Sequence, residues 1–231
     1  MGLQKISFRV PPGLWQAFAL QANQLFLSRA PFLDHMIARE TPHLAEDLAG
    51  RKLSVAAKRH ISGMLKKEGA QTASVNIEVT RETATALNQI IRDSNIVRDA
   101  FICRLIIFLR GSDSLLKNLG VPLEVKTNIH GSGHITGLEA MPSSPLKAME
   151  AVRDDPLYYI REHVTNNWGT GIYTVQLPRA LDWAACFIED KDVPGTEAYK
   201  VDQRLSAEMF ALLERDAFAN EPLIGRKDDS K

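Results

Sequence analysis

Residues 5–39 read KISFRVPPGLWQAFALQANQLFLSRAPFLDHMIAR, and residues 74–108 read SVNIEVTRETATALNQIIRDSNIVRDAFICRLIIF. The two stretches align without a gap at an offset of 69 residues. Few positions are identical, but polar and apolar residues follow the same order in both copies. This internal repeat is the feature from which the fold of the chain can be predicted.

Each copy begins with a segment in which apolar and polar residues alternate. In residues 5–10 the apolar positions are Ile6, Phe8 and Val10, and residues 74–79 follow the same rule. A period of two is typical of a strand that has one apolar and one polar face. Each copy is therefore expected to begin with a short strand.

Two helices are expected to follow each strand. Pro11 and Pro12 end the first strand and can begin a helix, and Thr80 is a suitable helix N-cap in the second copy. Apolar residues then recur at helical spacing, interrupted near residues 26–28 and again near 94–95. Each copy thus predicts a strand followed by two helices.

The two predicted strands need each other, because a single strand cannot satisfy its own backbone hydrogen-bonding groups. We expect them to pair as an antiparallel two-stranded ribbon over the four helices, in a mainly α chain with short β segments. The outward side chains are then Lys5, Ser7, Arg9, Ser74, Asn76 and Glu78. All six can hydrogen-bond the edges of bases, and a two-stranded ribbon fits the major groove of DNA.

Each copy resembles the ribbon-helix-helix unit of the Arc/MetJ/CopG superfamily, most plainly where KISFRVP is followed by LSRAPFLDHMI. The resemblance implies that the outward strand residues read bases and that the N-terminus of each second helix holds a phosphate. The phosphate-anchoring residues would be Ser28, Arg29, Val97 and Arg98. Most members of this family need two chains, whereas this sequence is similar to tandem members that carry both units. Phe26 lies in a turn where the family often has glycine.

A basic segment lies between the two copies. Residues 51–67 contain six basic residues and no acidic one: Arg51, Lys52, Lys58, Arg59, Lys66 and Lys67. Their spacing places them along one side of a predicted helix. Such a stripe is either solvated surface or a second set of phosphate contacts, and the sequence leaves both interpretations open.

The neutral total charge, 28 basic against 28 acidic residues, hides an asymmetry. Residues 1–119 have a net charge of +6 (16 − 10), and residues 120–231 have −6 (12 − 18). We therefore predict a basic DNA-binding domain at 1–119, with units at 4–40 and 73–110 and the insert at 41–72. Residues 120–231 are predicted to form an acidic α+β domain for oligomerisation or partner binding.

Within the acidic half, the pattern predicts a hairpin (residues 123–130 and 134–138) and a strand at 171–177. Helices are expected at 145–165, near 179–188 and at 201–219. No family resemblance is evident here. This half could assemble a homodimer or engage a protein such as RNA polymerase.

Catalytic and metal-binding patterns are weak. The two cysteines, Cys103 and Cys186, exclude a disulfide framework and fit a reducing cytoplasm. His130 and His134 could flank a turn, but no carboxylate pair or cysteine accompanies them, so no metal site and no cofactor are predicted. No nucleotide-binding or hydrolase motif and no membrane-spanning run occurs, and we expect a chain that is not an enzyme and has no membrane partner.

These observations predict a sequence-specific, double-stranded-DNA-binding transcriptional regulator. The similarity to tandem ribbon-helix-helix proteins of conjugative plasmids suggests a plasmid-transfer role. Two alternatives stay open: a relaxosome accessory protein at an origin of transfer, and an antitoxin whose C-terminal half binds a toxin. An enzyme in residues 120–231 with a DNA-binding appendage is disfavoured by the missing catalytic motifs.

Overall fold

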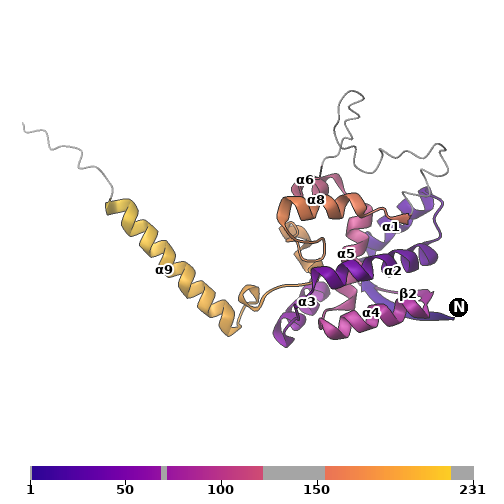
Figure 1. The fold of residues 1–231 in the computed structure, drawn as a ribbon, viewed down its shortest axis with the longest axis horizontal. Coiled ribbons are helices and arrows are strands. Elements are labelled where there is room, and N and C mark those ends of the chain that lie inside the picture. The colour runs from indigo at the N-terminus through magenta and orange to yellow at the C-terminus, as the bar shows by residue number, and fades with distance from the viewer. Residues whose placement is uncertain (1, 69–71, 122–153, 220–231) are drawn as a thin grey trace, which may run out of the picture. The chain divides into compact units, whose positions relative to one another are not determined.

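The computed structural model describes residues 2–68, 72–121 and 154–219 (Figure 1). The chain divides into two compact units, residues 1–188 and 189–231. The first unit contains β1 (Leu3–Val10), α1 (Pro12–Gln24), α2 (Arg29–Asp47), α3 (Val55–Glu68), β2 (Ala73–Thr80), α4 (Arg81–Asp93), α5 (Arg98–Arg110), α6 (Asp113–Asn118), α8 (Tyr158–Trp168) and the 3₁₀ helix η1 (Arg179–Ala184). The second contains η2 (Asp190–Asp192) and α9 (Glu197–Ala219). The prediction of a mainly helical chain with a small antiparallel sheet is confirmed.

The repeat is visible in the backbone as well as in the sequence. α1 and α4 begin 69 residues apart and end 69 residues apart, and α2 and α5 begin 69 residues apart. In the intervening turns, Phe26 and Asn95, again 69 residues apart, both have φ of 54°. Within the described residues they are the only non-glycine positions with positive φ. The two copies therefore share one local conformation.

β1 and β2 pair antiparallel, and the register follows the repeat. Ser7 lies opposite Asn76, which is the residue that the offset of 69 assigns as its counterpart. A local two-fold relation therefore passes through this pair and exchanges the two copies. The apolar face of the ribbon is buried: Ile6, Phe8 and Val10 are at most 3% exposed.

The helices obey the same two-fold relation. α2 packs against β2 and α4, whereas α5 packs against β1 and α1. The second helix of each copy thus lies on the strand and the first helix of the other copy. Since each copy completes the other's core, neither can bury its apolar surface alone.

The first compact unit, residues 1–188, extends well past the predicted boundary between residues 119 and 120. α8 and the segment after it pack on the first half of the chain through buried polar groups. Glu40 in α2 is fully buried, where it accepts hydrogen bonds from Arg161 and from the hydroxyl of Tyr173 (2.8 Å). The structural division at residues 188 and 189 therefore differs from the division by charge.

A chain of ion pairs continues from this buried carboxylate. Arg161 also binds Asp155 (2.6 Å), and Asp155 binds Arg39 of α2 (2.9 Å). Burial alone would raise the pKa of Asp155, but hydrogen bonds from Arg161 and Arg39 hold it below its usual value. Burial raises the pKa of Glu40, an effect that Arg161 and Tyr173 oppose. Helix α8 and the residues just before it are thus joined to α2 by charged side chains.

Two predictions for the acidic half need correction. The strand expected at 171–177 is wrong: residues 172–174 form a turn, and residues 154–219 contain no strand in the structure. Here the alternation reflects packing, because the buried Arg104 donates to the carbonyls of Ile172 and Val175. The helix expected near 179–188 is the shorter 3₁₀ helix η1.

The other elements of that half agree with the sequence or lie outside the described residues. The helix predicted at 201–219 is confirmed as α9, and α8 overlaps the end of the helix predicted at 145–165. The predicted hairpin at 123–138, including His130 and His134, lies outside the described residues.

Gly171, in the segment after α8, lies close to Asp47, the last residue of α2. A Cβ atom at Gly171 would lie 1.7 Å from Oδ1 of Asp47, and the other oxygen of Asp47 accepts a hydrogen bond from the backbone N–H of Tyr173 (2.8 Å). Burial raises the pKa of Asp47, an effect that this hydrogen bond opposes.

We predict that Gly171→Ala lowers the free energy of unfolding by about 1–3 kcal/mol, because Asp47 must move and release Tyr173. The measurement is urea denaturation. Gly63→Ala is the matched control: nothing lies within 4 Å of the added Cβ, and helix propensity favours alanine by roughly 1 kcal/mol. Equal stabilities of Gly171→Ala and the wild type would contradict the close approach at Asp47.

Candidate nucleic-acid interface

The outer face of the ribbon carries the six side chains that the sequence assigned to base reading. All six are exposed, while their neighbours in each strand turn toward the helices: Lys5, Ser7, Arg9, Ser74, Asn76 and Glu78. Because side chains alternate along a strand, this face is polar over these six positions, and the exposed Leu3 continues it beyond Lys5. The structure therefore brings these residues together on one surface.

Cross-strand pairing arranges the six residues in three rows. Lys5 lies opposite Glu78, Ser7 opposite Asn76, and Arg9 opposite Ser74. In the central row the Ser7 hydroxyl donates to Oδ1 of Asn76 at 2.5 Å. The outer rows are four residues apart, about 14 Å, which matches about four base pairs of DNA.

The two ends of the face differ in charge although the backbone is symmetric. One end carries the guanidinium of Arg9 beside the hydroxyl of Ser74, for a charge of +1. The other carries Lys5 beside Glu78, for a charge of zero. The local two-fold relation places Glu78 where the other copy has Arg9. The two ends of the face therefore offer different charged groups to a ligand.

The backbone beneath Arg9 is held by α5. Its N–H group donates to the carboxylate of Asp99, and its carbonyl accepts from Sγ of Cys103 at 3.5 Å. Burial raises the pKa of Asp99, an effect that the hydrogen bond from Arg9 opposes. At the other end, Asp34 of α2 accepts from the backbone N–H of Thr80 at 3.0 Å. Thus the second helix of each copy anchors the strand of the other copy.

The N-termini of α2 and α5 are the helix ends that the sequence assigned to phosphate anchoring. Neither Ser28 nor Val97, the N-cap residues, makes a side-chain capping hydrogen bond. The first N–H groups of a helix have no partner inside the helix, and the helix dipole favours an anion there. Ser28 and Arg29 are exposed, whereas Val97 and Arg98 are half-buried.

The turn before α5 is covered by the insert, which sequence reasoning missed. The amide of Asn95 donates to the carbonyl of Leu53 (2.9 Å), and Nζ of Lys58 donates to the Asn95 oxygen (2.9 Å). Lys58 therefore lies beside the N-terminus of α5 and is no free surface cation. Phe26, the counterpart of Asn95, is 97% exposed.

The remaining basic residues of the insert lie on a helix, as predicted, or just before it. Arg59, Lys66 and Lys67 on α3 are exposed, as are Arg51 and Lys52. α3 packs on α5 and η1, and the Arg51 guanidinium lies over the ring of Phe187, 5.6 Å from its centroid. These contacts tie the insert to the helices of the compact unit and do not bring its cations into the rows of the ribbon face.

Neither cysteine is a free surface thiol. Burial raises the pKa of Cys186 to about 12 and raises that of Cys103 still further, so both are protonated at neutral pH. Among the described residues, no three His, Cys, Asp or Glu side chains are placed to share a metal ion. No helix in the described ranges has the length and apolar character needed to cross a membrane.

Comparisons with protein families, curated proteins and solved structures found no match for this chain.

The positive φ shared by Phe26 and Asn95 gives a test of the turn geometry. We predict that Phe26→Gly raises the free energy of unfolding by up to about 1 kcal/mol, because a left-handed conformation is unfavourable for a residue with a Cβ. Asn95→Gly should lower it by about 1–2 kcal/mol, since two hydrogen bonds are lost. Thermal and urea denaturation measure the free energy of unfolding of both variants. If both changes had the same sign, the two turn residues would not have the different roles assigned to them here.

Proposed function

We propose that this chain is a sequence-specific, double-stranded-DNA-binding transcriptional regulator of the ribbon-helix-helix type, with both units in one polypeptide. The observation that carries the proposal is the exposed polar face of the β1–β2 ribbon, supported from beneath by an apolar face buried on four helices. A two-stranded ribbon fits the major groove, where each base pair presents a distinct pattern of donors and acceptors.

Arg9 is the principal base-reading residue in this proposal. A guanidinium can donate two hydrogen bonds to O6 and N7 of guanine, and such a pair discriminates against other bases by about 1–3 kcal/mol. The contacts of the Arg9 backbone with Asp99 and Cys103 fix the position from which its side chain extends. Such preorganisation reduces the entropy lost on binding.

Phosphate contacts position the ribbon in the groove. The uncapped N-termini of α2 and α5 are related by the same two-fold relation as the strands, so they can bind phosphates on either side of the ribbon. Arg29 and Arg98 begin these helices and add positive charge. Lys58 adds a further cation beside α5, and the exposed cations of the insert form a separate, outer set.

A single chain then reads a site without two-fold symmetry. Arg9 at one end favours guanine, whereas Glu78 at the other end can accept a hydrogen bond from N4 of cytosine. Ser7 and Asn76 bond to each other in the central row and have fewer groups left for bases. The same interface would serve a relaxosome accessory protein, and the genomic position of the bound sites separates the two roles.

We predict that Arg9→Ala weakens binding to the specific site by about 1–3 kcal/mol, roughly 5- to 150-fold, and changes binding to random DNA much less. Fluorescence anisotropy on both duplexes measures the difference. Arg29→Ala is the control: it should weaken both equally and lower the slope of log K against log salt by about 0.9, the value for one phosphate contact. If Arg9→Ala weakened binding to the specific and the random duplex equally, Arg9 would contact phosphate and not bases.

A second prediction concerns the asymmetry of the site. Sequences selected from random duplexes should lack two-fold symmetry; Arg9→Ala should relax preference at one end and Glu78→Ala at the other, about four base pairs away. Selection followed by sequencing provides the comparison. A palindromic site recovered with the wild type, or loss of preference at the same positions in both variants, would count against a directional ribbon.

A further inference from the structure

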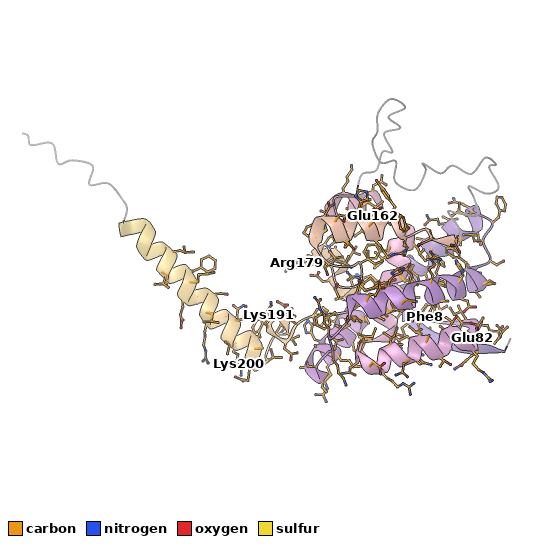
Figure 2. All side chains as sticks on the ribbon, in the orientation of Figure 1. Phe8, Glu82, Glu162, Arg179, Lys191 and Lys200 are labelled. Atoms are coloured by element: carbon orange, nitrogen blue, oxygen red, sulfur yellow. The ribbon has the colours of Figure 1, made fainter. Side chains whose placement is uncertain are left out.

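Helix α9 dominates the second compact unit and has an exposed apolar surface. It runs for 23 residues, about 34 Å, and its start is capped by the hydroxyl of Thr196, which accepts a hydrogen bond from the backbone N–H of Tyr199 (3.1 Å). Lys200 marks its N-terminal end in Figure 2 and pairs with Glu197 (2.6 Å). Within its unit, α9 packs against the short helix η2.

Five large apolar residues of α9 form what we call the α9 stripe. They occur at helical spacing and are each 51–60% exposed: Val201, Leu205, Met209, Leu212 and Leu213. At about 100° per residue they occupy roughly one third of the helix circumference. A helix gains most of its stability by burying such a face, so the stripe is expected to be covered in the assembled protein.

The charges beside the stripe indicate what covers it. Arg204 and Glu208 lie one turn apart along one edge and are both exposed. Within a helix, a basic residue four positions before an acidic one is the less favourable order for an ion pair. We therefore expect Arg204 and Glu208 to form ion pairs with a second helix and not with each other.

Only one orientation of two α9 helices makes these charges complementary. In a parallel pair in register, the edge that carries Arg204 and Glu208 would lie against the opposite edge of the other stripe, so these charges would not meet. In an antiparallel pair with its two-fold axis at residue 206, Arg204 of each helix faces Glu208 of the other. The same register places Val201 within one residue of Leu212 of the second helix, so the stripes cover each other.

We propose that α9 joins two copies of this chain in an antiparallel homodimer, with the α9 stripe at its centre and two Arg204–Glu208 pairs along one edge. This interface is independent of DNA binding. Its consequence for the proposed function is that one dimer carries two ribbons, and recognition of two sites multiplies their discrimination.

The first test uses the full chain and measures its mass by light scattering and its association by sedimentation. The wild type should have about twice the monomer mass of 25.7 kDa at tens of micromolar. Leu205→Asp should return it to the monomer mass, with a dissociation constant at least tenfold higher. Gln203→Asp is the matched control, since it adds the same charge on the side of α9 away from the stripe and should leave the dimer intact.

The second test addresses the orientation and does not depend on an apolar residue. Arg204→Glu and Glu208→Arg should each raise the dissociation constant several-fold, because each places like charges together twice. The double variant exchanges the charges and should restore wild-type association. Circular dichroism shows whether the helix persists in each variant.

Three results would overturn the proposal. A wild type that stays monomeric at 100 μM or above would show that no second copy covers the stripe. A dimer that persists in Leu205→Asp would place the contact elsewhere. Losses that add in the double variant would reject the antiparallel register. Binding of the monomeric wild type to lipid vesicles, abolished by Leu205→Asp, would assign the stripe to a membrane surface and also overturn the proposal.

Discussion

The pairing of β1 with β2 is the contact on which the rest of the compact unit depends. Each strand needs the other for its backbone hydrogen bonds, and both need the four helices to bury their apolar face. Because the register aligns Ser7 with its repeat counterpart Asn76, pairing the strands also sets the two-fold relation among the helices. A shift by one residue would turn Phe8 to solvent and Arg9 into the core.

Symmetry of the backbone and asymmetry of the side chains have different consequences. The repeated turn at Phe26 and Asn95, with the same φ, places the N-termini of α2 and α5 in equivalent positions. Only the second of these turns is covered by the insert, through Asn95 and Lys58. Two copies in one chain can therefore diverge separately, one retaining an open helix N-terminus and the other gaining a supporting segment, whereas two identical chains could not.

Buried polar side chains join α8 and the segment after it to the earlier helices of the first compact unit. Glu40, Arg161 and Tyr173 form a buried network in which each charged group has a partner, and Arg104 satisfies two carbonyls of the segment after α8. Removing one partner from such a network leaves another buried without compensation, so the network specifies this arrangement strongly. It also explains why a division of the chain by net charge does not coincide with its division into compact units.

The sequence by itself was sufficient for the repeat, for the strands and helices of its two copies and for their outward-facing residues, because these follow from local periodicity and from an offset that can be read directly. It did not reveal that Asn95 binds Leu53 and Lys58, or that residues 171–177 form a turn under Arg104. Those features depend on contacts between residues tens of positions apart, and alternation in a short segment looks the same whether its partner is a strand or a buried guanidinium. Local order was therefore determined by sequence pattern, whereas the extent of the compact unit and the contacts of its basic residues were decided by tertiary packing.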